Sequence, residues 1–301
     1  MASATERRLD DPDTRENIWN DPKIVEDYRI SERVTVVFAR SLVDQSGVIS
    51  DIDNEKPLCI LDNACGTGAL SLVLQETLRN RSSGWKLTCA DLSEAMVGSV
   101  AARIKEEGWK NTDTAVADMQ ATGLSANYYT HVFACFGLMI IPNGQKGLDE
   151  CLRVLKPGGT LGFTVWKQSG WLNDINDAIA SMPGNLKQPT PEEFSMALEN
   201  GDPWHDTDWI KSQLEKRGCK NIQITLVPRT LAPSPPSELI RVLTPLVNFI
   251  PVKFWSEEQR KESAANFAPA LLEYWNEKYG ADTPVPMEWI ATVVTACKAE
   301  N

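Results

Sequence analysis

The chain has 301 residues, enough for one large domain or two small ones with a full hydrophobic core. Hydrophobic residues make up 42% and charged residues 24%, proportions that are ordinary for a globular protein, and the formal net charge is −11. Because such a charge repels phosphate backbones and anionic lipid surfaces, we expect neither a nucleic acid nor a membrane as a partner.

The cysteines and the N-terminal residues bear on the compartment. The seven cysteines are odd in number, form no C-x-x-C pair and mostly lie in apolar runs, so neither a disulfide framework nor a zinc ribbon fits. The N-terminus passes into charged residues, and no apolar stretch approaches the ~20 residues that span a bilayer. We therefore expect a cytoplasmic protein without a secretory signal.

The first part of the chain predicts a tail, a long helix and then a regular alternation. Residues 1–14 are polar, and apolar residues at helical spacing follow over 16–47. Strands are predicted over 57–62, 85–91, 114–118, 130–138 and 160–166, with helices over 69–80, 93–107 and 147–155 between them. This alternation of apolar strands and helices is typical of a parallel sheet covered on both faces.

The second half of the chain is less regular. Helices are predicted over 171–181, 191–199, 207–217, 237–249 and 256–279, and strands over 221–227 and 291–298. We place these two strands at the far edge of the same sheet. The additional helices are expected to form a cap over the carboxyl edge of the sheet.

A glycine-rich turn follows the first predicted strand, where residues 62–69 read Asp-Asn-Ala-Cys-Gly-Thr-Gly-Ala. Small residues at Ala64, Gly66 and Gly68 let a ligand approach the backbone, and the following helix offers free N–H groups. The spacing is neither the G-x-G-x-x-G of a dinucleotide site nor a phosphate loop with a Gly-Lys-Ser/Thr ending. Taken alone, the turn also fits a tight strand–helix connection that needs glycine for packing.

Acidic residues end the second and third predicted strands. Asp91 lies beside the glycine turn, where open α/β sheets hold ribose hydroxyls. Asp91 also suits the start of the next helix, but Ser93 can take that capping role. The third strand ends at Asp118-Met119, in position to hydrogen-bond and pack against a base, although a methionine there also fits the core.

These features, taken in order, resemble the class I S-adenosylmethionine-dependent methyltransferases. The matching elements are Asp62-x-Ala64-x-Gly66-x-Gly68, Asp91, the Ala-Asp-Met step at 117–119 and the Arg-Val-Leu-Lys-Pro-Gly-Gly turn at 153–159. The resemblance covers about residues 55–167, with alanine at position 64 where most members have glycine. Further stretches, such as those at 57–66, 85–94 and 253–260, resemble the fungal gliotoxin thiol S-methyltransferases from about residue 18 to the C-terminus. Members of that group methylate the sulfurs of reduced dithiol diketopiperazines.

The resemblance implies a fold, a cofactor and a set of binding residues. The expected fold is α/β, with a Rossmann-like, doubly wound, seven-stranded sheet that is mostly parallel, a last strand that is antiparallel, and a helical cap. We expect N-terminal tail and lid helices over 1–50, a cofactor-binding core over 55–167 and a cap with the last two strands over 168–301, as a single folded unit. The implied cofactor is S-adenosylmethionine, with S-adenosylhomocysteine as product. Its implied contacts are Tyr28, Asp62, Ala64, Cys65, Gly66, Thr67, Gly68, Asp91, Leu92, Met96, Asp118, Met119, Cys135 and Phe136.

No residue stands out as a general base, and no acidic cluster on the fourth predicted strand suggests a Mg²⁺ site. His131 falls in the middle of a predicted strand and reads as structural, whereas His205 could reach a substrate from the cap or simply belong to a capping loop. A thiol with a pKa of about 8.5 supplies some thiolate at neutral pH, and an alcohol does not. We therefore favour metal-free transfer to sulfur or a neutral amine, driven by proximity.

The expected partner is a small molecule bound by a monomer or weak dimer. Alternatives are an O- or N-methyltransferase with His205 as its base, or a cofactor-binding regulator without catalysis. Aromatic side chains are the candidates for the substrate pocket: Trp19, Trp166, Trp171, Trp204, Phe249 and Trp255.

Overall fold

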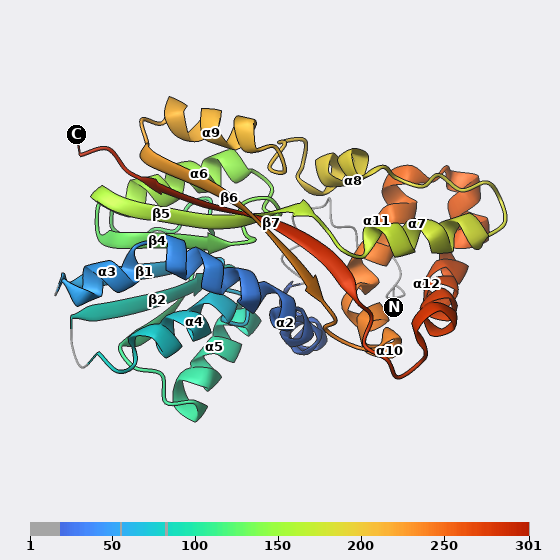
Figure 1. Cartoon of the computed structure of the whole chain (residues 1–301), viewed down its shortest axis with the longest axis horizontal. Coiled ribbons are helices and arrows are strands. Elements are labelled where there is room, and N and C mark those ends of the chain that lie inside the picture. Colours follow the sequence, from blue (N-terminus) through green and yellow to red (C-terminus); the bar gives the residue numbers. More distant parts are fainter. Residues whose placement is uncertain (1–18, 55, 82–83, 301) are drawn as a thin grey trace.

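The computed structural model describes residues 19–54, 56–81 and 84–300. Its centre is one seven-stranded sheet with the order β3-β2-β1-β4-β5-β7-β6 (Figure 1). The strands β1 to β5 pair in parallel, and β7 runs antiparallel to both β5 and β6. The strands are β1 (Leu58–Asn63), β2 (Trp85–Asp91), β3 (Thr112–Val116), β4 (Tyr129–Cys135), β5 (Leu155–Gln168), β6 (Lys220–Leu231) and β7 (Met287–Cys297). The expected fold class is confirmed.

The strand order reverses beside β1, and this places the helices on both faces. Right-handed crossovers put the helices between β1, β2 and β3 on one face and the helix between β4 and β5 on the other. The described helices are α2 (Pro22–Gln45), α3 (Val48–Asp53), α4 (Ala69–Leu78), α5 (Glu94–Glu106), α6 (Gly144–Val154), α7 (Leu172–Ser181), α8 (Pro191–Leu198), α9 (Thr207–Lys216), α10 (Pro236–Val242), α11 (Thr244–Phe254) and α12 (Glu257–Tyr279). None of these helices is long and apolar enough to cross a bilayer.

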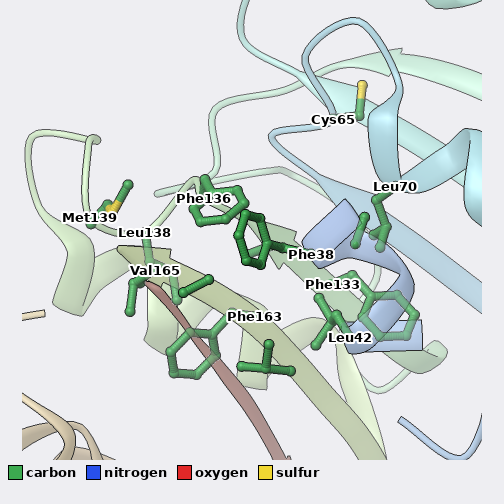
Figure 2. Close-up of a cluster of buried hydrophobic side chains, with 14 of the residues drawn as sticks. Phe38, Leu42, Cys65, Leu70, Phe133, Phe136, Leu138, Met139, Phe163 and Val165 are labelled. Atoms are coloured by element: carbon green, nitrogen blue, oxygen red, sulfur yellow. The ribbon is translucent and has the colours of Figure 1, made fainter. Parts of the chain in front are cut away.

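The core fixes α2 against the sheet. Figure 2 shows Phe38 of α2 beside Phe136 and Leu42 of α2 beside Phe133. Phe38 makes edge contacts with Phe136 and with Trp166, at ring-centroid distances of 6.0 and 5.3 Å. A Cβ on Gly162 of β5 would lie 2.8 Å from Phe133 and 3.1 Å from Leu42, so the helix can pack this closely only because residue 162 is glycine. The N-terminal helix is therefore an integral layer of the fold.

Several sequence expectations need correction. Strand β4 ends at Cys135, and not at residue 138, because Phe136 adopts a left-handed φ of 59°. The helix expected over 237–249 is two helices that meet at Leu243, where Pro245 opens the second. The short helix α3 was not expected. The expected tail over 1–14, and residues 16–18 of the first expected helix, lie outside the described residues.

The cap contains fewer helices than expected. Helices α7, α8, α10, α11 and α12 gather at one end of the sheet, beyond β5, whereas α9 lies beside α6 (Figure 1). Helix α9 packs against β6, and Arg217 after it donates to Asp149 of α6 at 2.6 Å. Its apolar face covers the sheet, so α9 belongs to the sheet-covering layer and the cap consists of the other five.

Candidate active site

The turn between β1 and α4 brings backbone groups to the carboxyl edge of the sheet. Ala64, Gly66 and Gly68 have φ values of 63°, 53° and 93°. All three lie in the left-handed region, which costs an L-residue with a side chain about 1–2 kcal/mol and glycine nothing. The side chains of Cys65 and Thr67 are buried. The turn thus presents its backbone, with the amino end of α4 behind it, to a ligand.

A buried acid lies beneath this turn. Asp62 is fully buried, and Ser71 donates to its Oδ2 at 2.6 Å. Burial raises the pKa of Asp62 to about 7. Its other carboxylate oxygen and the side-chain oxygen of Asn63 have no hydrogen-bond partner in the described part of the chain. The two side chains lie on opposite faces of the sheet, because Asp62 is bonded to Ser71 of α4 and Asn63 to Cys151 of α6.

Asp91 ends β2 next to the turn. Its Oδ2 accepts from the N–H of Gly66 at 2.8 Å, and its Oδ1 accepts from the N–H of Ser93 at 3.0 Å. Ser93 caps α5 by accepting from Met96, as expected. Burial raises the pKa of Asp91 above its usual value, while the two backbone N–H groups oppose that rise. Through these hydrogen bonds, Asp91 at the end of β2 holds both the glycine turn and the start of α5.

The residues expected around a base lie along the same edge, beyond Asp91. Leu92 is exposed, whereas Met96 and Met119 are buried. Asp118 accepts from the backbone N–H of Gln120 at 2.8 Å. The edge therefore has an open apolar side at Leu92 and a carboxylate at Asp118.

Helix α2 covers the turn from the other side. A Cβ on Gly66 would lie 3.2 Å from Cε1 of Tyr28, so the ring rests on the glycine backbone. Burial raises the pKa of Tyr28, which keeps its hydroxyl neutral. Trp19 meets Tyr28 edge to face at 5.7 Å, and its carbonyl accepts from Ser93 Oγ at 2.7 Å. Residues 19–28 therefore contact the glycine turn through Tyr28 and the start of α5 through Trp19.

A cavity of about 240 Å³ lies between α2, the carboxyl edge of the sheet and the cap. Its wall is mostly apolar and includes Phe136 and Trp166, whose rings stack at 3.9 Å. The strained Phe136 lies directly after Cys135, whose Sγ accepts from Thr164 Oγ1 at 3.3 Å. Burial raises the pKa of Cys135 to about 12. Of the residues expected in the two pockets, those that line the cavity are Trp19, Tyr28, Phe136, Trp166, Trp171 and Phe249.

Three of the residues expected at the substrate or as the base do not line this cavity, and neither do the residues of the glycine turn. Trp204 is fully buried against Phe163, and Trp255 donates its Nε1 hydrogen to the carbonyl of Lys187 at 3.1 Å. His205 turns its Nδ1 toward Glu199 Oε2, at 2.7 Å. Trp204 and Trp255 fill the core, and His205 stabilises a loop through Glu199. Each of these contacts lies away from the carboxyl edge of the sheet.

The cavity also contains residues that the sequence did not single out. Asp27 and Arg241 form an ion pair in its wall, and Met139 and Trp289 belong to its apolar part. In the sequence, the polar residues Asp27, Ser31 and Thr35 recur at four-residue spacing. This pattern could have predicted a polar helix face at one side of the cavity. Arg241 lies in the helix predicted over 237–249, and no pattern in the sequence singled it out. Within residues 19–54, 56–81 and 84–300, no group of three or more His, Cys, Asp or Glu side chains could hold a metal ion.

Comparisons with known proteins show which family this chain resembles. The profile of a family described as "Methyltransferase domain" matches residues 60–159. The chain is 35% identical over 284 residues to "Methyltransferase tpcH" of Aspergillus fumigatus, with 94% of this chain and 99% of that protein covered. It is 36% identical over 283 residues to the "Acetylaranotin bis-thiomethyltransferase" of Aspergillus terreus, with 94% and 97% covered.

Solved structures show a more distant likeness. One is the phosphoethanolamine N-methyltransferase 2 of Haemonchus contortus in complex with S-adenosyl-L-methionine, with 18% identity and a TM-score of 0.46. The match covers 81% of this chain and 49% of that one.

Proposed function

The chain belongs to the class I S-adenosylmethionine-dependent methyltransferases, and from this premise we propose that it methylates thiols of a small fungal secondary metabolite of the reduced dithiol diketopiperazine type. The observation that carries the proposal is the apolar, aromatic cavity at the carboxyl edge of the sheet, whose wall includes Tyr28, the residue that rests on Gly66 of the glycine turn. The 36% identity to a bis-thiomethyltransferase over nearly the whole chain supports sulfur as the acceptor atom.

The residues around the turn fit the cofactor that this family uses. The unpaired Oδ1 of Asp62 suits the ammonium group of its methionine portion, and Gly66 leaves room where a Cβ would press on Tyr28. Asp91 would hold the ribose hydroxyls, with Leu92, Met96, Asp118 and Met119 at the adenine. When bound, S-adenosylmethionine supplies an electrophilic methyl group on a sulfonium centre.

The protein's contribution to transfer is orientation and the exclusion of water. Phe136 and Trp166 form a rigid stacked wall, and Tyr28 closes the side toward the glycine turn. Holding donor and acceptor in line can supply up to roughly 7–11 kcal/mol of the barrier. His205 is engaged with Glu199 away from the cavity and does not supply a base there, so the proposal takes the acceptor's own acidity as the source of the nucleophile. A thiol meets that requirement near neutral pH, and an aliphatic alcohol does not.

The experiment is a competition between matched acceptors. Purified protein is incubated with S-adenosylmethionine labelled in its methyl group and with either a dithiol diketopiperazine or the diol of the same skeleton. We expect label on sulfur, and at least about a hundredfold lower transfer to the diol. Equal transfer to the diol would replace the proposal by O-methylation. Cofactor binding without transfer to thiols, phenols or amines would replace it by a non-catalytic role.

A further inference from the structure

Two charged side chains lie in the wall of the mostly apolar cavity, and they form an ion pair with each other. They are Asp27 of α2 and Arg241 of α10, and among the described residues no other Asp, Glu, Lys, Arg or His lines the cavity. Asp27 is only 6% exposed, whereas the side chain of Arg241 remains 48% exposed. Arg241 is therefore the more accessible member of the pair.

Asp27 uses only part of the hydrogen-bonding capacity of Arg241. One terminal guanidinium nitrogen donates to Asp27 Oδ1, and among the described residues this is the one hydrogen bond that the side chain of Arg241 makes. A guanidinium carries five N–H donors in a rigid plane. The ion pair therefore orients that plane and leaves most of its donors available to a ligand.

The contact between α2 and α10 does not depend on this pair alone, because a second ion pair joins the same two helices. Arg33 of α2 lies 3.3 Å from Glu238 of α10 and also donates to Ser234 Oγ at 2.9 Å and to the carbonyl of Pro233 at 3.0 Å. Neither Arg33 nor Glu238 lines the cavity. The two helices are thus joined by one ion pair outside the cavity and by another in its wall.

A ligand that fills the cavity has to satisfy the donors of Arg241. It displaces water from the guanidinium, and a purely apolar ligand would leave the N–H groups without acceptors, which costs binding free energy. An anionic group is disfavoured, because Asp27 already balances the charge of Arg241 and would repel a second negative charge. A carbonyl oxygen accepts from the guanidinium and adds no charge. The pair therefore favours a ligand carbonyl over a carboxylate or a phosphate.

We propose that Arg241 anchors the substrate by donating to a ring carbonyl oxygen, and that Asp27 holds the guanidinium in place without contacting the substrate. This inference rests on the proposed function, because a diketopiperazine ring carries two carbonyl groups, and the contact needs no N–H group on the ring. The stacked rings of Phe136 and Trp166 pack against the rest of the molecule. A ligand of the same shape without a carbonyl oxygen leaves the guanidinium unpaired, so the site discriminates against it.

The test measures the binding of two ligands that contain no thiol. The first, the carbonyl ligand, is the cyclic dipeptide of glycine and phenylalanine with a methyl group on both ring nitrogens. The second is its dithione, in which sulfur replaces both carbonyl oxygens and is a weaker hydrogen-bond acceptor. Calorimetry gives the dissociation constants of both ligands for the protein saturated with S-adenosylhomocysteine.

Two variants differ from each other only in the guanidinium. Asp27→Asn keeps Arg241, and the double variant Asp27→Asn/Arg241→Met removes it without leaving a buried carboxylate unpaired. Relative to Asp27→Asn, we expect the double variant to bind the carbonyl ligand about 10- to 150-fold more weakly, and the dithione less than about fivefold more weakly. Glu238→Ala is the control for the contact between α2 and α10, because it breaks the ion pair with Arg33 and should change neither affinity.

Three results would overturn the inference. They are equal affinities of the two variants for the carbonyl ligand, an equal loss of affinity for both ligands in the double variant, and no binding of the carbonyl ligand to the wild-type protein at millimolar concentration. The affinity for S-adenosylhomocysteine should match that of the wild-type protein in every variant. A loss of that affinity in the double variant would mean that the pair only holds α2 in place, which would also overturn the inference. Because calorimetry uses no methyl donor, failure of thiol methylation would leave this result unchanged and is measured separately.

Discussion

Two residues beside the candidate site hold backbone conformations that glycine would adopt more easily. Ala64 has a φ of 63° and Phe136 a φ of 59°. The first is a conformation that glycine adopts without strain, and the second ends β4 at the cavity wall. A Cβ on Gly137 would lie 3.0 Å from that of Ala64, so the turn and the end of β4 support each other. Strain of this kind persists where the surrounding packing imposes it, as it does at many functional sites.

Asp91→Ala should weaken the binding of S-adenosylhomocysteine. The variant removes the charged acceptor proposed for the ribose and also two hydrogen bonds that hold Gly66 and Ser93. Hydrogen bonds to a charged group contribute about 1.5–3 kcal/mol, so we expect affinity to fall about 10- to 150-fold in a calorimetric titration. The control is Asp113→Ala, which deletes an exposed carboxylate of β3 paired with Lys86 and should leave affinity unchanged. Unchanged affinity in a folded Asp91→Ala variant would remove Asp91 from the site.

His131 should make the protein less stable in mild acid. Its ring is 1% exposed, its Nε2 lies 3.8 Å from Asp51, and burial lowers its pKa from 6.5 to about 4. Between these values the unfolded chain binds a proton that the folded chain does not, so stability falls as pH falls from 6.5 toward 4. From pH 7 to pH 5 the loss is about 2 kcal/mol.

The measurement is urea unfolding of the wild-type protein and of His131→Gln at both pH values. The difference between their pH slopes isolates His131, because the raised pKa values of Asp62 and Glu199 act in the opposite direction in both proteins. Identical slopes in the two proteins would contradict the prediction.

At the scale of elements, α2 connects the two halves of the site. Tyr28 rests on the glycine turn, Asp27 faces the cavity, and Glu32 accepts from Thr67 Oγ1 in the turn itself. Glu32 also pairs at 2.7 Å with Arg103 of α5, and both side chains are nearly buried. Because one helix makes all of these contacts, a shift of α2 would alter the glycine turn and the cavity together.

Glu32→Ala should lower the free energy of unfolding by about 3 kcal/mol, because it leaves a buried guanidinium with fewer partners. Because Glu107 also pairs with Arg103, we expect this loss of unfolding free energy to lie at the lower end of the range for a broken buried ion pair. The matched control on the same helix is Arg40→Ala, whose pair with Glu76 is largely exposed and should contribute less than about 1 kcal/mol. Urea unfolding of both variants measures the difference. Equal small losses would show that the Glu32 pair does not anchor the helix.

At the scale of the whole molecule, the sheet and most helices of the cap could be predicted from the sequence, and the contacts between the cap helices could not. Strand β2 begins and ends where expected, because a continuous apolar run bounded by polar residues needs only local information. The order of the strands follows from the handedness of their connections. The cavity wall, in contrast, joins residues as far apart as Asp27 and Arg241, and no local pattern predicts which helices of a cap will meet.

The aromatic residues illustrate the same limit. Trp166 lies near the end of β5 and Trp171 follows that end, so their place at the cavity follows from the sheet. Trp204 and Trp255 occur in equally polar surroundings in the sequence, yet one packs on Phe163 and the other on Phe267. Composition identified candidates for the pocket, and only long-range packing separated those that line it from those that fill the core.

Methyl transfer should be independent of metal ions. The described residues hold no cluster of three or more potential ligands, and the mechanism proposed above uses orientation alone. Activity measured with excess chelator should equal that of the untreated enzyme. A loss of activity that Mg²⁺ restores would mean that a metal organises the acceptor.

The pH dependence of the reaction tests the source of the nucleophile in the intact enzyme. If the substrate's own ionisation supplies the thiolate, kcat/KM should rise tenfold per pH unit up to the thiol's pKa, about 8.5 for an unperturbed thiol, and then level off. His205→Gln should leave this profile in place and lower the rate by far less than the 10²- to 10⁴-fold typical of a lost general base, because His205 faces Glu199 and not the cavity. The control is the affinity for S-adenosylhomocysteine, which should match that of the wild-type protein. A folded His205→Gln variant with normal cofactor affinity and a thousandfold lower rate would place the base in the cap. Good activity on a hydroxylated substrate together with that loss would make oxygen the acceptor.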